Sequence, residues 1–156
     1  MHTEDFQRLA DRLAVEETIT TMFVATDARD WERVAQCFAA EVLLDMSSVG
    51  GAPPARFAPT QITAGWDAAF RPLDAVHHQI GNLQVRLRGD EADATCHGVA
   101  WHYRRGATGG NTRLFVGSYL FHLVRDRRGW LIDRFRFDLK FIDGNPQLEE
   151  RARPTS

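Results

Sequence analysis

The chain has 156 residues, of which 44% are hydrophobic and 26% are charged. This size and balance predict one globular domain over residues 1–156, with enough apolar residues for a sizeable core. The 19 basic and 21 acidic residues give a net charge of -2 and are spread along the chain. That distribution excludes the electrostatic footprint of a nucleic-acid binder or of an anionic-membrane binder, so we expect a small, weakly charged partner.

Targeting signals and disulfides are not indicated by the sequence. No apolar run approaches the ~20 residues that span a bilayer, and residues 1–12 are polar and lack a signal-peptide core. We therefore expect a cytoplasmic protein without membrane contact. Cys37 and Cys96 lie far apart, in segments with helical and strand patterns, which favours reduced buried thiols over a disulfide framework.

The N-terminal third of the chain has helical spacing. Between Glu4 and Ala25, apolar residues recur mostly at steps of three and four, which predicts one buried face of a single helix or of two joined helices ending near Asp27. The apolar residues concerned are Phe6, Leu9, Leu13, Val15, Ile19, Met22 and Phe23. Asp30 is in the position of an N-cap, so a second short helix is expected directly after it.

The next segment carries weaker signals. Residues 42–46 are expected to form a short strand, and residues 47–60, with two glycines and three prolines, a loop. Residues 66–73 are expected to hold one more short helix.

The pattern changes to that of strands at Val76. Four long runs rich in β-branched and aromatic residues are separated by glycine-containing turns: residues 76–88, 92–105, 114–125 and 130–142. Helices followed by consecutive antiparallel strands predict an α+β domain with the helices packed on one face of the sheet. The tail, residues 145–156, is polar, and we expect it to fray or to cross to a partner subunit.

Three segments carry a family resemblance. They are LAVEETITTMFVATDARDWERVAQCFAAEVLLDM, VHHQIGNLQVRL, and an RRGW turn that leads into a last strand closing with DGNP. Together, over about residues 8–146, they resemble the SnoaL-like, scytalone dehydratase-like family of the nuclear transport factor 2-like superfamily. This resemblance implies a cone-shaped fold in which N-terminal helices pack on a strongly bent antiparallel sheet and enclose a pocket.

The resemblance also implies a catalytic pair. In the related dehydratase and dehydrochlorinase, an aspartate at the end of the first long helix bonds a histidine at the start of the first meander strand, and that histidine removes a proton from the substrate. Asp27 and His78 match these positions. A carboxylate on one ring nitrogen fixes the tautomer and leaves the other nitrogen as a base near neutral pH. The alternative is that Asp27 only caps the neighbouring turn and His78 is a core histidine.

Three further residues are candidates for binding the substrate. His102 shares one strand face with five small residues, which would leave space for a cavity: Ala92, Ala94, Cys96, Gly98 and Ala100. The resemblance makes His102 the counterpart of a second histidine that holds a water or a substrate oxygen. It places Tyr119 where the dehydratase has a pocket amide, so its phenol would polarise a carbonyl, unless the ring only packs in the sheet. Asn82 is a candidate pocket amide.

The remaining histidines do not form a metal site by spacing. His97 and His102 are five residues apart on a strand and therefore face opposite ways, and the adjacent His77 and His78 also diverge. His77 and His122 are expected to be structural or exposed. No phosphate-binding glycine loop follows a strand, so we expect neither a metal nor a cofactor.

Two functions from different classes remain open. The first is a lyase or isomerase in which the dyad abstracts a proton from a mostly apolar, ring-containing substrate. The chain has Thr26 and Met22 where the dehydratase and the dehydrochlorinase have a tyrosine and a lysine, so neither of those substrates is implied. The second is a non-catalytic ligand-binding or assembly module, such as an oxygenase β-subunit-like protein.

We also expect a homodimer or homotrimer, because the open sheet carries more aromatic surface than the helices can cover. The residues expected on that outer face are Trp101, Tyr103, Phe121 and Phe141.

Overall fold

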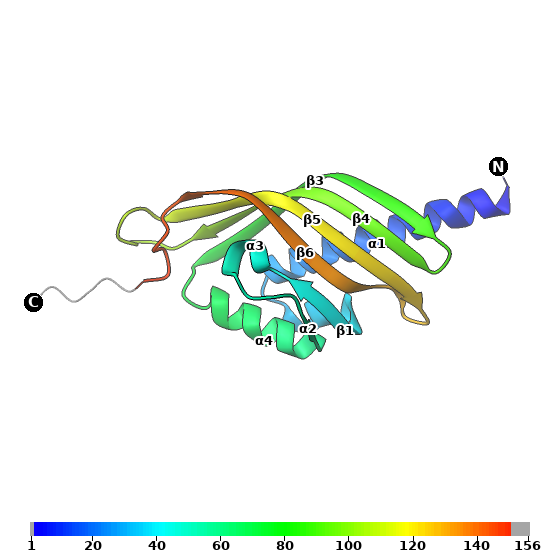
Figure 1. Cartoon of the computed structure of the whole chain (residues 1–156), viewed down its shortest axis with the longest axis horizontal. Helices are drawn as coiled ribbons and strands as arrows, with labels where there is room; N and C mark the ends of the chain where they lie inside the picture. The colour runs from blue at the N-terminus through cyan, green and yellow to red at the C-terminus, as the bar shows by residue number, and fades with distance from the viewer. Residues whose placement is uncertain (1, 151–156) are drawn as a thin grey trace, which may run out of the picture.

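A computed structural model describes residues 2–150, and its first element is α1 (Thr3–Asp27), one continuous helix. The second half of the helix forms the predicted buried face, with Val15, Ile19, Met22 and Phe23 in the core. The first half leaves Phe6, Leu9 and Leu13 about half exposed, because it extends past the edge of the sheet (Figure 1). The predicted buried face is therefore correct only for the half of α1 that has a sheet to pack on.

A defined turn ends α1 and fixes its last residue, Asp27. The backbone N–H of Asp30 donates to the carbonyl of Ala25 at 2.9 Å, and Arg29 adopts the left-handed conformation with φ 56°. This is the Schellman arrangement that satisfies the last carbonyls of a helix. The Arg29 guanidinium then donates to the carbonyl of Leu73 at 2.6 Å. The end of α1 is thereby tied to the segment that leads into the third strand.

The short helix α2 (Trp31–Gln36) follows, and the predicted N-cap is confirmed. The Asp30 side chain accepts a hydrogen bond from the backbone N–H of Arg33 at 3.2 Å. The first strand, β1 (Phe38–Asp45), begins four residues before the predicted start at Val42. It can begin earlier because it pairs in parallel with the last strand of the chain, a long-range partner that local pattern does not reveal.

The segment predicted as a loop, residues 47–60, is structured, and that prediction was wrong. It contains α3 (Ser47–Gly50), β2 (Ala55–Phe57) and the first residues of α4 (Pro59–Phe70). Strand β2 exists because it pairs with β1, and three residues are too few to show periodicity. Pro59 starts α4 because a proline suits the first helical position, and the Gln61 side chain accepts from the Ala58 backbone N–H at 2.8 Å.

The four predicted long strands are present within a few residues of their predicted bounds. They are β3 (Ala75–Arg88), β4 (Glu91–Tyr103), β5 (Thr112–Asp126) and β6 (Gly129–Gly144). The sheet order is β2-β1-β6-β5-β4-β3, and β3 to β6 form the predicted antiparallel meander. The parallel β1–β6 pair makes the sheet mixed. Register shifts in the β3–β4 and β5–β6 pairs accompany the bend of the sheet over the helices (Figure 1).

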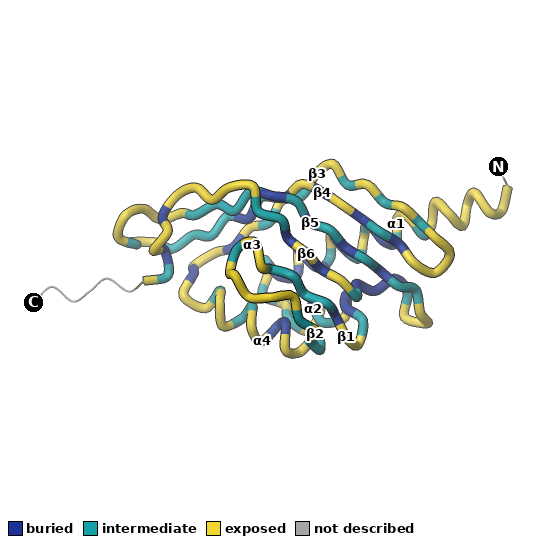
Figure 2. The backbone as a smooth tube through the Cα atoms, in the orientation of Figure 1, coloured by how far each residue is buried: buried dark blue, intermediate teal, exposed yellow. Residues whose placement is uncertain are grey.

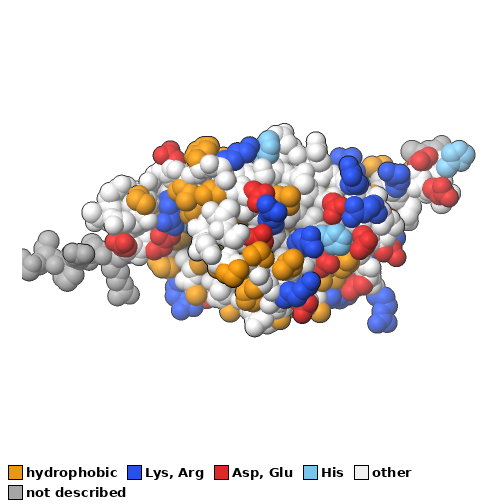
Figure 3. All heavy atoms as spheres, viewed as in Figure 1, with side chains coloured by type: hydrophobic (Ala, Val, Ile, Leu, Met, Phe, Trp, Pro, Cys, Tyr) orange, Lys and Arg blue, Asp and Glu red, His pale blue; other side chains and the backbone are white. Residues whose placement is uncertain are grey.

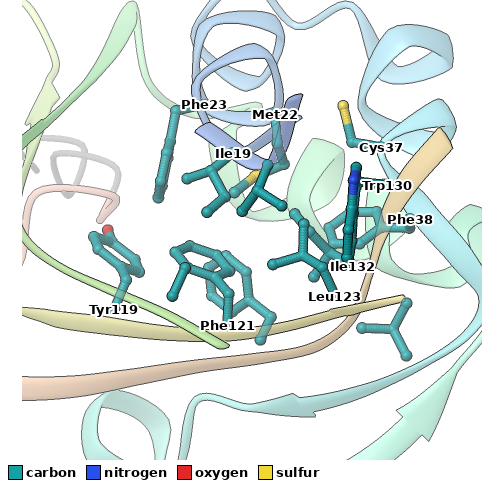
Figure 4. Close-up of a cluster of buried hydrophobic side chains, with 14 of the residues drawn as sticks. Ile19, Met22, Phe23, Cys37, Phe38, Tyr119, Phe121, Leu123, Trp130 and Ile132 are labelled. Atoms are coloured by element: carbon teal, nitrogen blue, oxygen red, sulfur yellow. The ribbon is translucent and has the colours of Figure 1, made fainter. Parts of the chain in front are cut away.

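The two faces of the sheet have opposite character, since buried residues alternate with more exposed ones along β4 and the second half of β5 (Figure 2). The inner face packs on α1, with Tyr119 and Phe121 directed towards Ile19 and Phe23 (Figure 4). Phe121 is therefore a core residue, and its expected place on the outer face was wrong. The error is one of register: Phe121 stands two residues after Tyr119, so both side chains lie on the inner face of β5.

The outer face retains the other aromatic residues of the oligomerisation hypothesis. Trp101 and Tyr103 are partly exposed, and Phe141 is 54% exposed. On the face of the molecule in Figure 3, acidic and basic side chains alternate without a field of one sign, in keeping with the small net charge. Among the described residues, no helix combines the length and apolar character that a bilayer crossing requires.

Residues 145–150 pack on their own chain. The Asn145 amide donates to the carbonyls of Thr108 and Gly110 at 2.9 and 2.8 Å, and Leu148 is fully buried against Leu73 and its neighbours. The expectation that the tail frays or crosses to a partner is therefore wrong for these residues, because a buried leucine and a bonded amide hold them in place. Residues 151–156 lie outside the described residues.

Candidate functional site

A small, partly open cavity of about 60 Å³ lies between α1, α4 and the inner face of the sheet. Its walls are mostly aromatic or thioether side chains, with His78 as the polar ring among them. The lining residues are Met22, Phe23, Thr26, Met46, Trp66, Phe70, His78, Tyr119 and Phe135. A larger depression of about 550 Å³ lies over the outer face beside Asn82 and His97. It is open and polar, so the smaller cavity is the better candidate for chemistry that excludes water.

Asp27 and His78 are in direct contact at this cavity. The Asp27 carboxylate receives the backbone N–H of His78 on one oxygen at 2.8 Å, and its other oxygen lies 2.6 Å from Nδ1 of the His78 ring. The His78 side chain is only 10% exposed. With Nδ1–H donating to Asp27, the ring presents Nε2 as a hydrogen-bond acceptor. The predicted proximity of the two side chains is thus an observed feature of the fold.

Three elements hold this pair in position. Asp27 is the last residue of α1, whose end is anchored by Arg29, and His78 is the fourth residue of β3. The rings of Phe23 and Phe70 flank the imidazole at centroid distances of 5.3 and 6.4 Å. These rings limit the orientations of the imidazole and keep bulk water from it, so both the tautomer and the direction of the ring are determined by the fold.

A second aspartate–histidine pair elsewhere in the sheet provides an internal comparison. Nδ1 of His122 lies 2.6 Å from the Asp133 carboxylate, the same distance as in the first pair. His122 is on the outer face of β5, 20% exposed, with Glu91 3.7 Å from its other ring nitrogen. Its free nitrogen therefore faces a carboxylate and solvent. What distinguishes His78 is the apolar cavity at Nε2, since the pairing distance is the same in both.

Tyr119 lines the same cavity and packs edge-on to Phe23, with centroids 4.8 Å apart. Burial raises the pKa of its phenol above the ordinary value, with smaller contributions from Cys96 and Asp27. Tyr119 is therefore a protonated hydrogen-bond donor at neutral pH. A Cβ at Gly98 would collide with its ring, so Tyr119 occupies the room above Gly98. The space expected from the small side chains of β4 is filled by this ring.

His102 lies on the same inner face but outside the cavity lining. It pairs in register with Val76 and Arg113, and its ring packs 5.4 Å from Phe70 and 4.9 Å from Phe115. Burial, assisted by the positive charges of His78 and Arg113, lowers the pKa of His102 to about 4. His102 is therefore a neutral ring at neutral pH, and Phe70 packs against both His102 and His78.

Asn82 is not brought to this site. It lies at the register shift of β3 with φ 55°, and its amide contacts Nδ1 of His97 at 3.0 Å on the outer face. The expectation that Asn82 supplies a pocket amide beside His78 does not agree with this position. The cause is the extra residue between Gly81 and Gln84, which changes the side to which Asn82 points.

His77 and the two cysteines do not line the cavity, and neither cysteine has an activated thiol. His77 is exposed and lies 5.7 Å from the Trp101 ring. Burial raises the pKa of both Cys37 and Cys96 to about 11, so neither thiol is an activated nucleophile. Within residues 2–150, no three histidine, cysteine or acidic side chains gather in a metal-binding arrangement.

The sequence pattern did not reveal two of the cavity walls. Trp66 and Phe70 enter the cavity wall from α4, and the Phe70 ring packs against both His78 and His102. Their spacing of four residues places them on one face of the helix predicted over residues 66–73, but no local signal shows that this face meets His78.

Solved structures share this arrangement of helices and bent sheet. A protein from Kribbella flavida is 23% identical, with a TM-score of 0.86 over 91% of this chain and 98% of that one. A nuclear transport factor 2-like protein with a cystatin-like fold from Novosphingobium aromaticivorans is 23% identical, with a TM-score of 0.70 over 93% and 90%. A type 3 hexachlorocyclohexane dehydrochlorinase from Novosphingobium barchaimii is 14% identical, with a TM-score of 0.73 over 96% and 99%.

These similarities define the class: the chain has the nuclear transport factor 2-like fold. The family follows from the sequence itself, since residues 7–136 match the model of the SnoaL-like domain. The chain belongs to the SnoaL-like family. No curated protein matches it significantly.

Proposed function

We propose that this protein is a lyase or isomerase that removes a proton from a small, ring-containing substrate, with His78 as the base and Asp27 as the group that orients it. One observation carries the proposal. The Asp27 carboxylate lies 2.6 Å from Nδ1 of His78, and the ring belongs to the wall of a small, aromatic-lined cavity. The same pairing at His122 lacks such a cavity and is given no catalytic role.

The proposed chemistry uses the groups already present at the cavity. Nε2 of His78 takes a proton from a carbon next to a carbonyl or to a carbon that bears a leaving group. The positive charge that the ring gains is stabilised by Asp27 and by the C-terminal end of the α1 dipole. Tyr119, protonated because its pKa is raised, donates a hydrogen bond to the substrate oxygen where negative charge develops. Departure of the leaving group with its bonding electrons then completes an elimination, whereas return of the proton to another carbon completes an isomerisation.

The similarity to a hexachlorocyclohexane dehydrochlorinase supports this class of reaction, because dehydrochlorination is an elimination. At 14% sequence identity, this similarity supports a shared fold but does not identify a substrate. The aromatic walls formed by Phe23, Trp66 and Phe135 favour a flat, mostly apolar ring. A ring needs more room than about 60 Å³, so Trp66 or Phe70 must move when the substrate enters.

Proton exchange tests the proposal without knowledge of the natural substrate. Cyclic ketones such as 2-tetralone would be incubated with the protein in D₂O, and incorporation of deuterium next to the carbonyl followed by mass spectrometry. We expect exchange above the buffer rate, reduced by ~100-fold to ~10,000-fold in His78→Ala. His122→Ala is the matched control and should retain the wild-type rate. Equal exchange in wild type and His78→Ala would remove the catalytic role.

A second candidate function is a non-catalytic ligand-binding or assembly module. The observation that favours it is the small size of the cavity, which is largely filled by Trp66, Phe70 and Phe135. In that case the Asp27–His78 pair joins the end of α1 to β3 as a structural link. If the protein binds cyclic ketones but exchanges deuterium into none of them, the result favours this module over the enzyme.

A further inference from the structure

A buried arginine stands at the end of the sheet, next to the candidate site. Arg113 is on the inner face of β5, directly opposite His102 in the β4–β5 register, and its side chain is only 12% exposed. Its guanidinium carbon lies 5.0 Å from the centre of the Phe115 ring. A buried guanidinium is costly unless it is paired, so its partners indicate what the position is for.

The partner of Arg113 is a carboxylate from the C-terminal segment. One terminal nitrogen of Arg113 donates to Glu149, and the other donates to the carbonyl of Pro146 at 3.3 Å. Nε of Arg113 is buried and makes no hydrogen bond to any described residue. A guanidinium can hold a carboxylate with two parallel N–H bonds, and Glu149 uses only one of its nitrogens. Arg113 therefore has a spare donor in a buried position.

A second unpartnered atom faces the same carboxylate. Nδ1 of His102 is buried without a hydrogen bond among the described residues, and it lies 4.0 Å from the nearer Glu149 oxygen. Two buried polar atoms without a hydrogen bond thus belong to Arg113 and His102, the two residues whose side-chain nitrogens lie within 4.0 Å of the Glu149 carboxylate. Buried groups of this kind are rare in folded proteins and call for an explanation, of which a ligand that completes the bonding is one.

Glu149 can leave this position while its segment stays in place. The segment is held independently by the fully buried Leu148 and by the bonds from Arg104 to the carbonyls of Leu148 and Glu150. The Glu149 side chain itself is 33% exposed. Rotation of that side chain into solvent would therefore free Arg113 without unfolding the C-terminal segment.

The position adjoins the proposed catalytic base. His78 pairs with Ala100, so His102 is its diagonal neighbour on β4, at roughly 7–8 Å between Cα atoms. The Phe70 ring packs against both, with its centre 5.4 Å from His102 and 6.4 Å from His78. Displacement of Phe70 would join the cavity at His78 to the space around Arg113.

We propose that Arg113, with His102 beside it, binds a carboxylate group of the substrate, and that Glu149 occupies this position as an internal carboxylate when the substrate is absent. The substrate class is then a ring-containing carboxylic acid, more polar at one end than the sequence alone suggested. The location of the reacting carbon rests on the proposed function. The binding of a carboxylate at Arg113 does not depend on it.

Benzoate is the probe that tests the site, and its affinity would be measured by calorimetry. Removal of the internal competitor in Glu149→Gln should tighten benzoate binding at least about fivefold, because the binding-competent state is then fully populated. Arg113→Gln should weaken it at least about tenfold, through loss of charge-assisted hydrogen bonds. Glu150→Gln and Arg86→Gln, at exposed positions, are the matched controls and should bind as wild type does. Neutral benzamide should not show the Glu149→Gln effect.

Two results would overturn the proposal. One is an equal change in benzoate affinity for Glu149→Gln and Glu150→Gln, which would mean a general charge effect. The other is tightening of benzamide to the same extent as benzoate in Glu149→Gln. Because the Glu149 side chain is 33% exposed, we expect Glu149→Gln to fold, and it tests the site even if Arg113→Gln does not fold. Glu149-dependent benzoate binding in a protein that shows no deuterium exchange would remove the catalytic proposal and leave this one, so the two failures are distinguishable.

Discussion

Both carboxylate oxygens of Asp27 bind the same residue, His78: one accepts its backbone N–H at 2.8 Å, and the other contacts its ring nitrogen Nδ1 at 2.6 Å. The backbone bond aligns the carboxylate, and the ring bond selects the Nδ1–H tautomer. This double contact joins the end of α1 to the start of β3. It also makes the protonation pattern of His78 a measurable consequence of the fold.

Asp27→Asn should reverse the tautomer of His78. The asparagine oxygen can still accept the backbone N–H, but the amide nitrogen then faces Nδ1 as a donor and favours protonation at Nε2. We expect ¹⁵N NMR at neutral pH to report Nδ1–H in the wild type and Nε2–H in the variant, and any His78-dependent turnover to fall ~100-fold to ~10,000-fold. Asp133→Asn should change the tautomer of His122 and leave that of His78 unchanged. Retention of Nδ1–H at His78 in Asp27→Asn would contradict the orienting role.

His102 should make the protein sensitive to acid. The pKa of His102 is lowered from 6.5 to about 4 in the folded chain, so between these values the unfolded chain binds the extra proton. Stability therefore falls as the pH falls through this window. We expect His102 to account for about 2 kcal/mol of the loss in unfolding free energy between pH 7 and pH 5. Urea unfolding at the two pH values should show a smaller loss in His102→Gln, and an unchanged loss in the exposed His97→Gln. If His102→Gln and His97→Gln both lose as much unfolding free energy between pH 7 and pH 5 as the wild type does, this assignment is refuted.

Gly98→Ala should destabilise the protein through Tyr119. A methyl group at Gly98 would overlap the Tyr119 ring and force it out of the cavity wall. Overpacking of this kind costs about 1 to 3 kcal/mol. Gly81→Ala, on the neighbouring strand, is the control, because its methyl group would meet no atom within 4 Å. Denaturant unfolding of both variants measures the difference, and equal stabilities would show that the Tyr119 ring is free to move.

We propose that the outer face of the sheet mediates a homodimer or homotrimer. Trp101, Tyr103 and Phe141 lie on this face, and exposed aromatic groups favour association. Light scattering should give two or three times the monomer mass at micromolar concentration. Phe141→Asp should lower that mass, while Phe6→Asp, at a similarly exposed position on α1, should not. A wild-type monomer would refute the proposal.

Local pattern was sufficient for the elements that carry their own periodicity. The buried half of α1, the Asp30 cap and the four strands from β3 to β6 could each be predicted, because their spacing reflects one buried face. The family resemblance added the Asp27–His78 pair, which no local rule connects across 51 residues.

Only the tertiary structure decided the features that depend on long-range partners. Strand β2 and the early start of β1 need their neighbours in the sheet, and one extra residue in β3 turns Asn82 away from the cavity. The Tyr119 ring fills the space over Gly98, and Glu149 reaches Arg113 because Leu148 is buried. Spacing along a chain fixes which face a side chain takes within one element. Packing between elements fixes which faces meet, and that depends on contacts between residues far apart in sequence.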